Sequence, residues 1–186
     1  MDVRASEEGV VLDVANEFRK GAWLSSTGHY AAAMNLYTRL LFSTEGQVDY
    51  DLRAEALACL AASIWRLCLA LGHGEADEYI PLIEDAVERA TGSVAEARAL
   101  LSGAWMCSNG GRILDSAAID FLARAQAVIA THVWREINSE WAMAVHIARE
   151  LALAPVCESP DAAAADRVER IFALLKIQGD AIREAR

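Results

Sequence analysis

The chain has 186 residues, 54% of them hydrophobic, and a formal net charge of −10 at pH 7. Its Arg residues are scattered and its two lysines are Lys20 and Lys176, so we expect it to bind neither nucleic acid nor anionic membrane surfaces. Abundant Ala and only 3 Pro favour helix over strand. We therefore predict a single all-α domain spanning residues 1–186.

The cysteines and the N-terminus indicate the compartment. Cys59, Cys68, Cys107 and Cys157 form no C-x-x-C pair that would chelate zinc or cycle as a dithiol. The start MDVRASEEGVV has no basic segment followed by an apolar run, as a secretory signal would. The uncharged run 56–65 is half of the roughly 20 residues that a membrane span needs, and the longer uncharged run 21–38 contains several polar residues. We expect a soluble cytoplasmic protein.

Turn signals divide the chain into eight predicted helices. A glycine or glycine-rich segment follows each of three tryptophans, where positive φ would end a helix, at Gly28, 72–74 and 109–111. Further on, Ser93 and Glu96 form a capping box. The predicted helices, in chain order, lie at about 9–27, 30–43, 50–71, 75–90, 94–109, 113–130, 132–153 and 160–178.

The last two helices have their own start and stop signals. Thr131 is a candidate N-cap for the seventh helix, and Ser159-Pro160-Asp161 supplies a cap, a first-position Pro and a first-turn acid for the eighth. Gly179 is a candidate stop for the eighth helix. The helices would pair into hairpins at about 9–43, 50–90, 94–130 and 132–178.

Aromatic residues recur with a period near 42 residues. The octet GAWLSSTG at 21–28 returns as GAWMCSNG at 103–110. Trp23, Trp65 and Trp105 are 42 and 40 residues apart, and Tyr37, Tyr79 and Phe121 are 42 and 42 apart. Such self-similarity is typical of stacked supersecondary units, in which we interpret the tryptophans as packing anchors. The fourth hairpin lacks these markers and would be a divergent or capping unit.

One segment carries a family resemblance. Residues 21–40, GAWLSSTGHYAAAMNLYTRL, contain the pattern G-x-Y-x-x-A-x-x-x-Y as Gly28, Tyr30, Ala33 and Tyr37. This segment resembles a tetratricopeptide repeat, although the period exceeds that family's 34 residues by about eight and its helix-ending Pro is missing. The resemblance implies a right-handed α-solenoid in which Gly21 allows close helix crossing and Tyr37 fills the gap between helices.

The same resemblance implies a concave groove lined by the first helix of each hairpin. The groove positions are Phe18, Ala22, Ser25, Leu60, Ile64, Leu67, Leu100, Ala104 and Cys107. None is charged, so we expect an apolar or amphipathic segment of a partner protein, with the acidic rim favouring a basic one. The alternative is that the groove is filled by the N-terminal segment, by the fourth hairpin, or by a second copy in a homodimer.

Two functions fit this reading. The first is an adaptor or complex subunit that holds a partner segment. The second is a small chaperone for a hydrophobic client, because the chain resembles the helical-repeat chaperones of bacterial secretion systems in size and acidity.

The usual motifs of three large enzyme classes are missing. The chain has no phosphate-binding loop, nucleophile elbow or H-E-x-x-H zinc helix, so we predict no catalytic residues, no cofactor and no metal. A metal-dependent helical enzyme would have to use His132 and Glu136 with His146 and Glu150, all predicted on one face of the seventh helix. A solvated polar face explains these four residues better.

Overall fold

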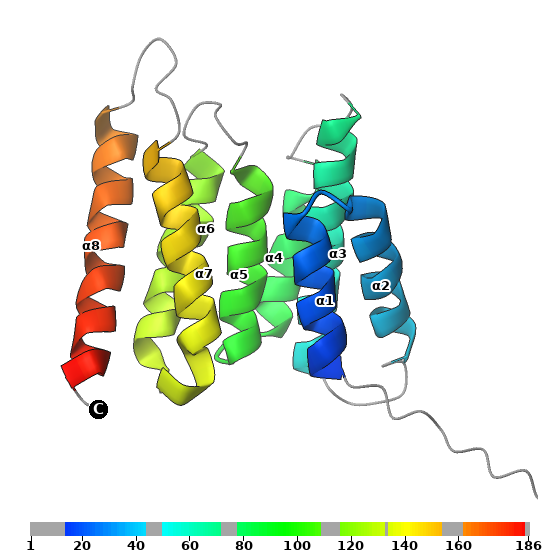
Figure 1. Cartoon of the computed structure of the whole chain (residues 1–186), viewed down its shortest axis with the longest axis horizontal. Helices are drawn as coiled ribbons and strands as arrows, with labels where there is room; N and C mark the ends of the chain where they lie inside the picture. The colour runs from blue at the N-terminus through cyan, green and yellow to red at the C-terminus, as the bar shows by residue number, and fades with distance from the viewer. Residues whose placement is uncertain are drawn as a thin grey trace, which may run out of the picture.

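A computed structural model describes residues 14–43, 50–71, 78–108, 116–132, 134–153 and 162–184. These residues form eight α-helices and no strand, which confirms the all-α prediction. Figure 1 shows the helices side by side, from α1 and α2 at one end to α8 at the other. The helices are α1 (Val14–Ser26), α2 (Tyr30–Ser43), α3 (Tyr50–Ala70), α4 (Ile80–Arg89), α5 (Val94–Cys107), α6 (Ser116–Thr131), α7 (Trp134–Leu153) and α8 (Ala162–Glu184).

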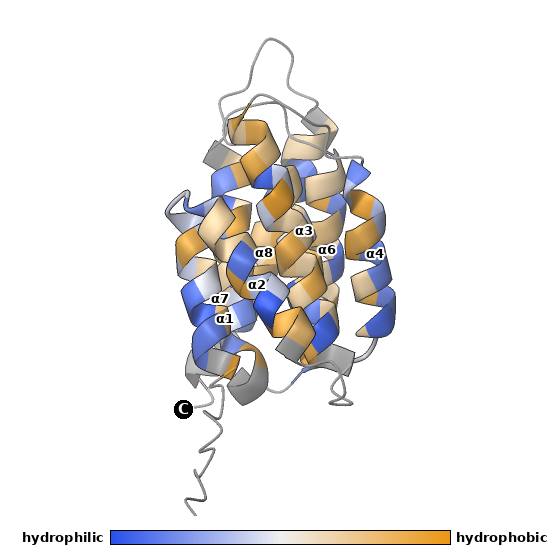
Figure 2. Cartoon of the chain, turned by 90° about the vertical axis from the view of Figure 1, so that its right-hand side faces the viewer, coloured by the Kyte–Doolittle hydropathy of each residue, from blue (hydrophilic) through white to orange (hydrophobic). Residues whose placement is uncertain are grey.

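Contacts between helices are mostly local in sequence. Each helix packs against the next one in the chain, and α3 also packs on α5, α5 on α7 and α6 on α8. A large buried core runs from α3 to α8, and a smaller one joins α1 and α2 to α3. Seen from the α1–α2 end, hydrophobic residues concentrate between the helices while α1 and α4 turn hydrophilic sides outward (Figure 2).

Two glycines let a first helix approach an aromatic ring of the second. A Cβ built on Gly21 would lie 2.5 Å from Cζ of Tyr37, and one on Gly103 would lie 3.0 Å from the ring of Phe121. Any side chain at either position would displace the ring or the helix. The predicted close crossing at Gly21 is confirmed, and Gly103 repeats it. This shared requirement explains part of why the octet occurs twice.

The turn at Gly28 also follows the prediction. Its φ of 81° is a conformation that L side chains rarely adopt, so Gly is favoured there. His29 N–H closes the turn by donating to Leu24 O at 2.8 Å. Gly92, between α4 and α5, has the same conformation with φ 83°.

The fourth hairpin also packs a glycine against an aromatic ring, but here the glycine is on the second helix and the ring is on the first. A Cβ on Gly179 of α8 would lie 2.5 Å from Cζ2 of Trp141 on α7. Trp141 Nε1 donates to Leu175 O at 2.8 Å. The prediction that Gly179 stops the helix is therefore wrong, because α8 continues to Glu184 and the glycine makes room for an indole ring.

The start of α4 differs from the sequence prediction. The helix begins at Ile80, and Pro81 occupies its first turn, where no N–H is needed. Tyr79 lies just before the helix, whereas Tyr37 and Phe121 lie inside α2 and α6. The three aromatic positions are therefore not equivalent, despite their equal spacing in the chain.

The starts of α5 and α7 also depart from expectation. Ser93 is the N-cap of α5, but its hydroxyl donates to Ala90 O, and Glu96 accepts from the N–H of Gly92 at 2.6 Å. The predicted capping box is therefore not formed, because the Ser93 side chain does not bond the first turn of α5 and Glu96 bonds the N–H of Gly92 instead of that of Ser93. Thr131 belongs to α6 and donates to Val128 O at 2.8 Å, so it is not the cap of α7.

Several predictions lie outside the described residues: the start of the first helix at 9–13, the glycine-containing segments 72–74 and 109–111, Cys157 and Ser159-Pro160-Asp161. Within the part of the chain that the structure describes, no helix combines the length and apolarity needed to cross a membrane.

Candidate functional site

Three charged residues link α3, α5 and α7. Arg98 of α5 donates from Nη1 to Glu55 of α3 at 2.8 Å and from Nε to Glu140 of α7 at 2.5 Å. The two partners are 43 and 42 residues from Arg98 in the chain. The ion pairs therefore join positions on three helices that are 42 or 43 residues apart in the chain, close to the spacing of the aromatic residues. We call this trio the ladder, and the side of α3 and α5 that carries it the ladder face.

The carboxylates of the ladder are nearly buried, whereas its arginine reaches solvent. The side chains of Glu55 and Glu140 are 11% and 5% exposed, and that of Arg98 is 40% exposed. Burial disfavours the charge on Arg98, but the two carboxylates outweigh it and raise its pKa above the ordinary value. Since two carboxylates share one guanidinium, the trio carries an excess negative charge.

Neutral hydrogen bonds continue the ladder toward the first hairpin. Cys59 Sγ lies 3.6 Å from Ser102 Oγ, and Ser25 Oγ lies 3.1 Å from Ser63 Oγ. Burial, with the nearby charge of Glu55, raises the pKa of Cys59 to about 12. Its thiol is therefore protonated at neutral pH and is not an activated nucleophile.

Aromatic rings and one arginine cover the far end of the ladder face. Arg66 of α3 donates to the backbone carbonyls of Trp105 and Ser108, where α5 ends, and its guanidinium lies 4.2 Å from the centre of the Trp105 ring. Tyr30, at the start of α2, contacts the indole of Trp105, with ring centroids 6.4 Å apart. Carbonyls at a helix C-terminus and the face of an indole both favour a cation. Trp105, Tyr30 and Arg66 remain partly exposed.

The predicted groove positions on α5 belong to the core. Leu100, Ala104 and Cys107 are all fully buried. At 100° per residue they lie on the opposite side of α5 from Arg98 and Trp105. The prediction chose positions two residues away from the face that is open, so these three residues cannot line an open groove.

The other predicted groove positions are divided among several surroundings. Phe18 packs on Tyr37 with ring centroids 5.9 Å apart, and Ala22 is exposed. Ser25 is buried against Ser63. Leu60, Ile64 and Leu67 are partly buried, and Leu60 packs on the small core formed by α1, α2 and α3. These residues do not form one continuous lining.

The three repeat tryptophans differ in burial. Trp65 is 3% exposed and donates from Nε1 to Met106 O at 2.7 Å. Trp105 is half-buried under Arg66, whereas Trp23 is 60% exposed and stacks on His29. The interpretation of all three as core anchors is wrong for Trp23. Equal spacing in sequence did not place these rings in equivalent surroundings.

The candidate metal ligands do not form one site. His132 precedes α7, and its Nδ1 lies 3.0 Å from Val128 O. His146 and Glu150 are exposed on α7, and the side chain of Glu136 lies outside the described residues. Because a helix rises about 1.5 Å per residue, His146 is roughly 18 Å along α7 from its start. Among the described side chains, no group of three His, Cys, Asp or Glu is placed to hold a metal.

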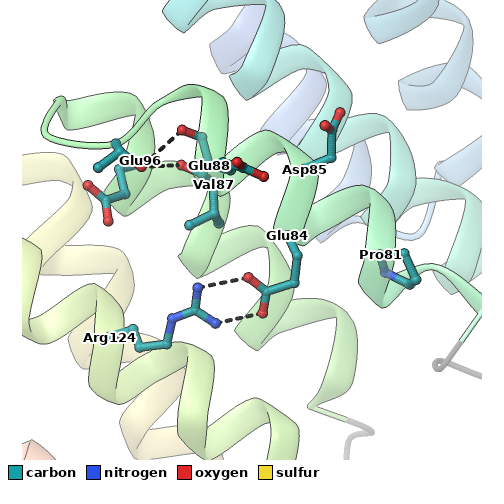
Figure 3. Close-up of a pocket in the computed structure, with 8 residues that line it drawn as sticks. Pro81, Glu84, Asp85, Val87, Glu88, Glu96 and Arg124 are labelled. Carbon is teal, nitrogen blue, oxygen red and sulfur yellow. Dashed lines mark hydrogen bonds and ion pairs between the residues drawn. The ribbon is translucent and has the colours of Figure 1, made fainter.

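A shallow hollow of 610 Å³ lies between α4, the start of α5 and α6 (Figure 3). Arg124 of α6 forms a two-pronged ion pair with Glu84 of α4, at 2.6 and 2.8 Å. Both side chains are about 40% exposed, so water screens the pair. The hollow is lined by Pro81, Glu84, Asp85, Val87, Glu88, Thr91, Glu96 and Arg124.

The hollow and the ladder face are on different sides of the protein. Glu96, which lines the hollow, precedes Arg98 by two residues and so points about 200° away from it around α5. A ligand bound at one would not touch the other. Searches of protein-family models, of curated proteins and of solved structures found no match to this chain.

Proposed function

We propose that the chain is a tetratricopeptide-like stack of four helical hairpins, right-handed and non-catalytic, that holds a segment of another protein as an adaptor or complex subunit. The observation that carries the proposal is the ladder. Ion pairs at spacings of 43 and 42 residues connect α3, α5 and α7. Repeated surfaces laid side by side are how helical-repeat proteins build an extended binding face.

The ladder face has the chemistry of a docking site. The half-exposed rings of Trp105 and Tyr30 offer large, rigid contact area, which is typical of the residues that dominate binding energy. The net charge of −10 favours a basic partner. The occupant we propose is an amphipathic segment whose apolar side meets the rings and whose polar side carries Lys or Arg.

The proposal is tested with a peptide array of amphipathic helical segments of graded net charge. Basic members should bind saturably and acidic members should not. Fluorescence anisotropy with the best peptide should show that Trp105→Ala weakens binding about tenfold or more, as expected for a central aromatic contact. Glu88→Lys, on the hollow side, is the matched control and should leave affinity nearly unchanged.

Two results would contradict the proposal. One is that no peptide binds saturably while helical content, followed by circular dichroism, is intact. The other is that Glu88→Lys abolishes binding while Trp105→Ala does not, which would assign the docking site to the hollow.

A further inference from the structure

The first hairpin is attached to the rest of the protein through fewer helix pairs than the other hairpins are. Among the described residues, its helices make one extensive contact outside the hairpin, that of α2 with α3. By contrast, α5 packs on both α3 and α4, and the fourth hairpin packs on the third through α5–α7, α6–α7 and α6–α8. Figure 1 shows α1 and α2 at one end of the row of helices. Loss of the α2–α3 contact would therefore free most of this hairpin.

The buried core is divided at the same place. The small core is made of buried side chains from α2 together with Ala56 of α3, and it is separate from the large core of α3–α8. Phe18 and Leu24 of α1 are only partly buried against it. Hydrophobic stabilisation is roughly proportional to the apolar area that is buried, and units with few buried apolar contacts open at lower free energy. We therefore expect the hairpin to open more readily than the helices of the large core.

Neutral polar groups bridge the seam between this hairpin and α3. Ser25 of α1 and Ser63 of α3 are buried, with their hydroxyl oxygens 3.1 Å apart. The phenol of Tyr37 and the thiol of Cys59 also form a hydrogen bond across the seam. Such groups exchange their bonds for bonds to water when a seam opens, so each bond adds little net stability. These two bonds therefore hold the hairpin in position without making it costly to open.

Contacts inside the hairpin couple α1 to α2. The helices cross closely where Gly21 faces Tyr37, and Phe18 packs on the same ring with centroids 5.9 Å apart. Glu17 and Arg39 form an ion pair at 3.4 Å between the two helices. α1 and α2 should therefore move together. A helical pair of this length without tertiary contacts is marginal in water, so its amides exchange once it has left α3.

We propose that the α1–α2 hairpin (14–43) is a lid that undocks from α3 as one unit while α5–α8 stay folded. Tyr30 moves with the lid, whereas its ring partner Trp105 stays on α5. Undocking therefore separates the two rings of the proposed docking site. A partner segment that contacts both rings bridges the seam and holds the lid closed, and this consequence rests on the proposed function.

Hydrogen exchange of the full chain without peptide, followed by mass spectrometry, tests the lid. The slowest amides of α1 and α2 should exchange together, and about tenfold or more faster than the slowest amides of α5. Ala56→Glu places a carboxylate in the small core and should remove the protection of α1 and α2, while α5–α8 keep theirs. Ala32→Glu is the matched control, because Ala32 is exposed on α2 and its replacement should leave exchange unchanged.

The free chain can overturn the proposal in two ways. The slowest amides of α1 and α2 could exchange as slowly as those of α5, which would make the chain one cooperative unit. Ala56→Glu could remove protection from every helix or from none, which would show that the hairpin is not a separate unit held at this seam.

Exchange with the best peptide of the array tests the coupling of the lid to the ladder face. Bound peptide should slow the exchange of α1 and α2 in wild type, because it binds only the docked state, and Trp105→Ala should abolish this slowing. If no peptide binds, the proposed function fails, whereas exchange of the free chain still decides whether the lid exists. A bound peptide that leaves the exchange of α1 and α2 unchanged would contradict the coupling.

Discussion

The ladder and the hollow both contain Arg–Glu ion pairs, but the pairs differ in how deeply the carboxylate is buried. Arg98 and Arg124 are 40% and 38% exposed, and each binds a Glu that lies about one repeat period away in the chain. Their carboxylates differ: Glu140 is 5% exposed and Glu84 is 43% exposed. A nearly buried carboxylate depends on its arginine, whereas an exposed one is solvated by water. The burial of the carboxylate, and not the presence of an ion pair, therefore decides how much the pair matters for stability.

The largest difference should appear when the two arginines are removed in turn. Arg98→Met leaves Glu55 and Glu140 close together without a cation. We expect the free energy of unfolding to fall by about 3 kcal/mol or more. Arg124→Met leaves only exposed carboxylates and should cost about 1 kcal/mol or less. Urea unfolding followed by circular dichroism measures both, and equal losses would contradict the distinction.

An intermediate effect is expected at the end of the ladder face. Arg66 is partly buried, and burial lowers its pKa, but it donates to two carbonyls at the end of α5. Arg66→Met removes these charge-assisted bonds and should cost about 2 kcal/mol in the same assay. A loss no greater than that of Arg124→Met would mean that the carbonyls are adequately solvated without it.

A smaller effect is expected from acid at the hollow. The hydrogen bond from Arg124 lowers the pKa of Glu84 below its ordinary value of 4.5. The stabilisation from this pair is therefore complete above the unfolded pKa and is lost as pH falls through the lower folded pKa. Unfolding measured from about pH 3 to 7 should show a shallower loss below about 4.5 in Arg124→Met than in wild type. Identical pH profiles would show that the pair contributes nothing.

The smallest predicted effect concerns reactivity, not stability. Because the pKa of Cys59 is raised to about 12 by burial, iodoacetamide should label it very slowly at a mildly alkaline pH in the folded protein. Labelling should become fast in urea, and mass spectrometry of the peptides reports both rates. Fast labelling in the native state would show that water reaches the interior of the ladder face.

Sequence reasoning worked where one residue's backbone or size decided the structure. Gly28 needs positive φ, and Gly21 needs room for Tyr37, so both could be predicted from glycine next to an aromatic pattern. It failed where one residue type can either end a helix or make room for a neighbouring side chain. Gly179 looked like a helix stop because its role depends on Trp141, which is distant in the chain.

The proposed docking face was harder to predict than the helices. A shift of two residues on α5 exchanges the open Arg98 side for the buried Leu100 side, and helix periodicity alone does not settle which side neighbours will cover. Glu55, Arg98 and Glu140 do recur at the repeat spacing. However, Glu and Arg are common in this chain, so their spacing becomes informative only once the helices are placed.

The central claim is that a partner segment lies on the ladder face and not at the hollow. Benzoylphenylalanine, an aromatic photo-crosslinker, can replace Trp105 in one variant and Glu88 in another, and each variant can be irradiated with the tightest peptide of the array. The account predicts a covalent adduct at position 105 and none at 88. An adduct at 88, with none at 105, would contradict it.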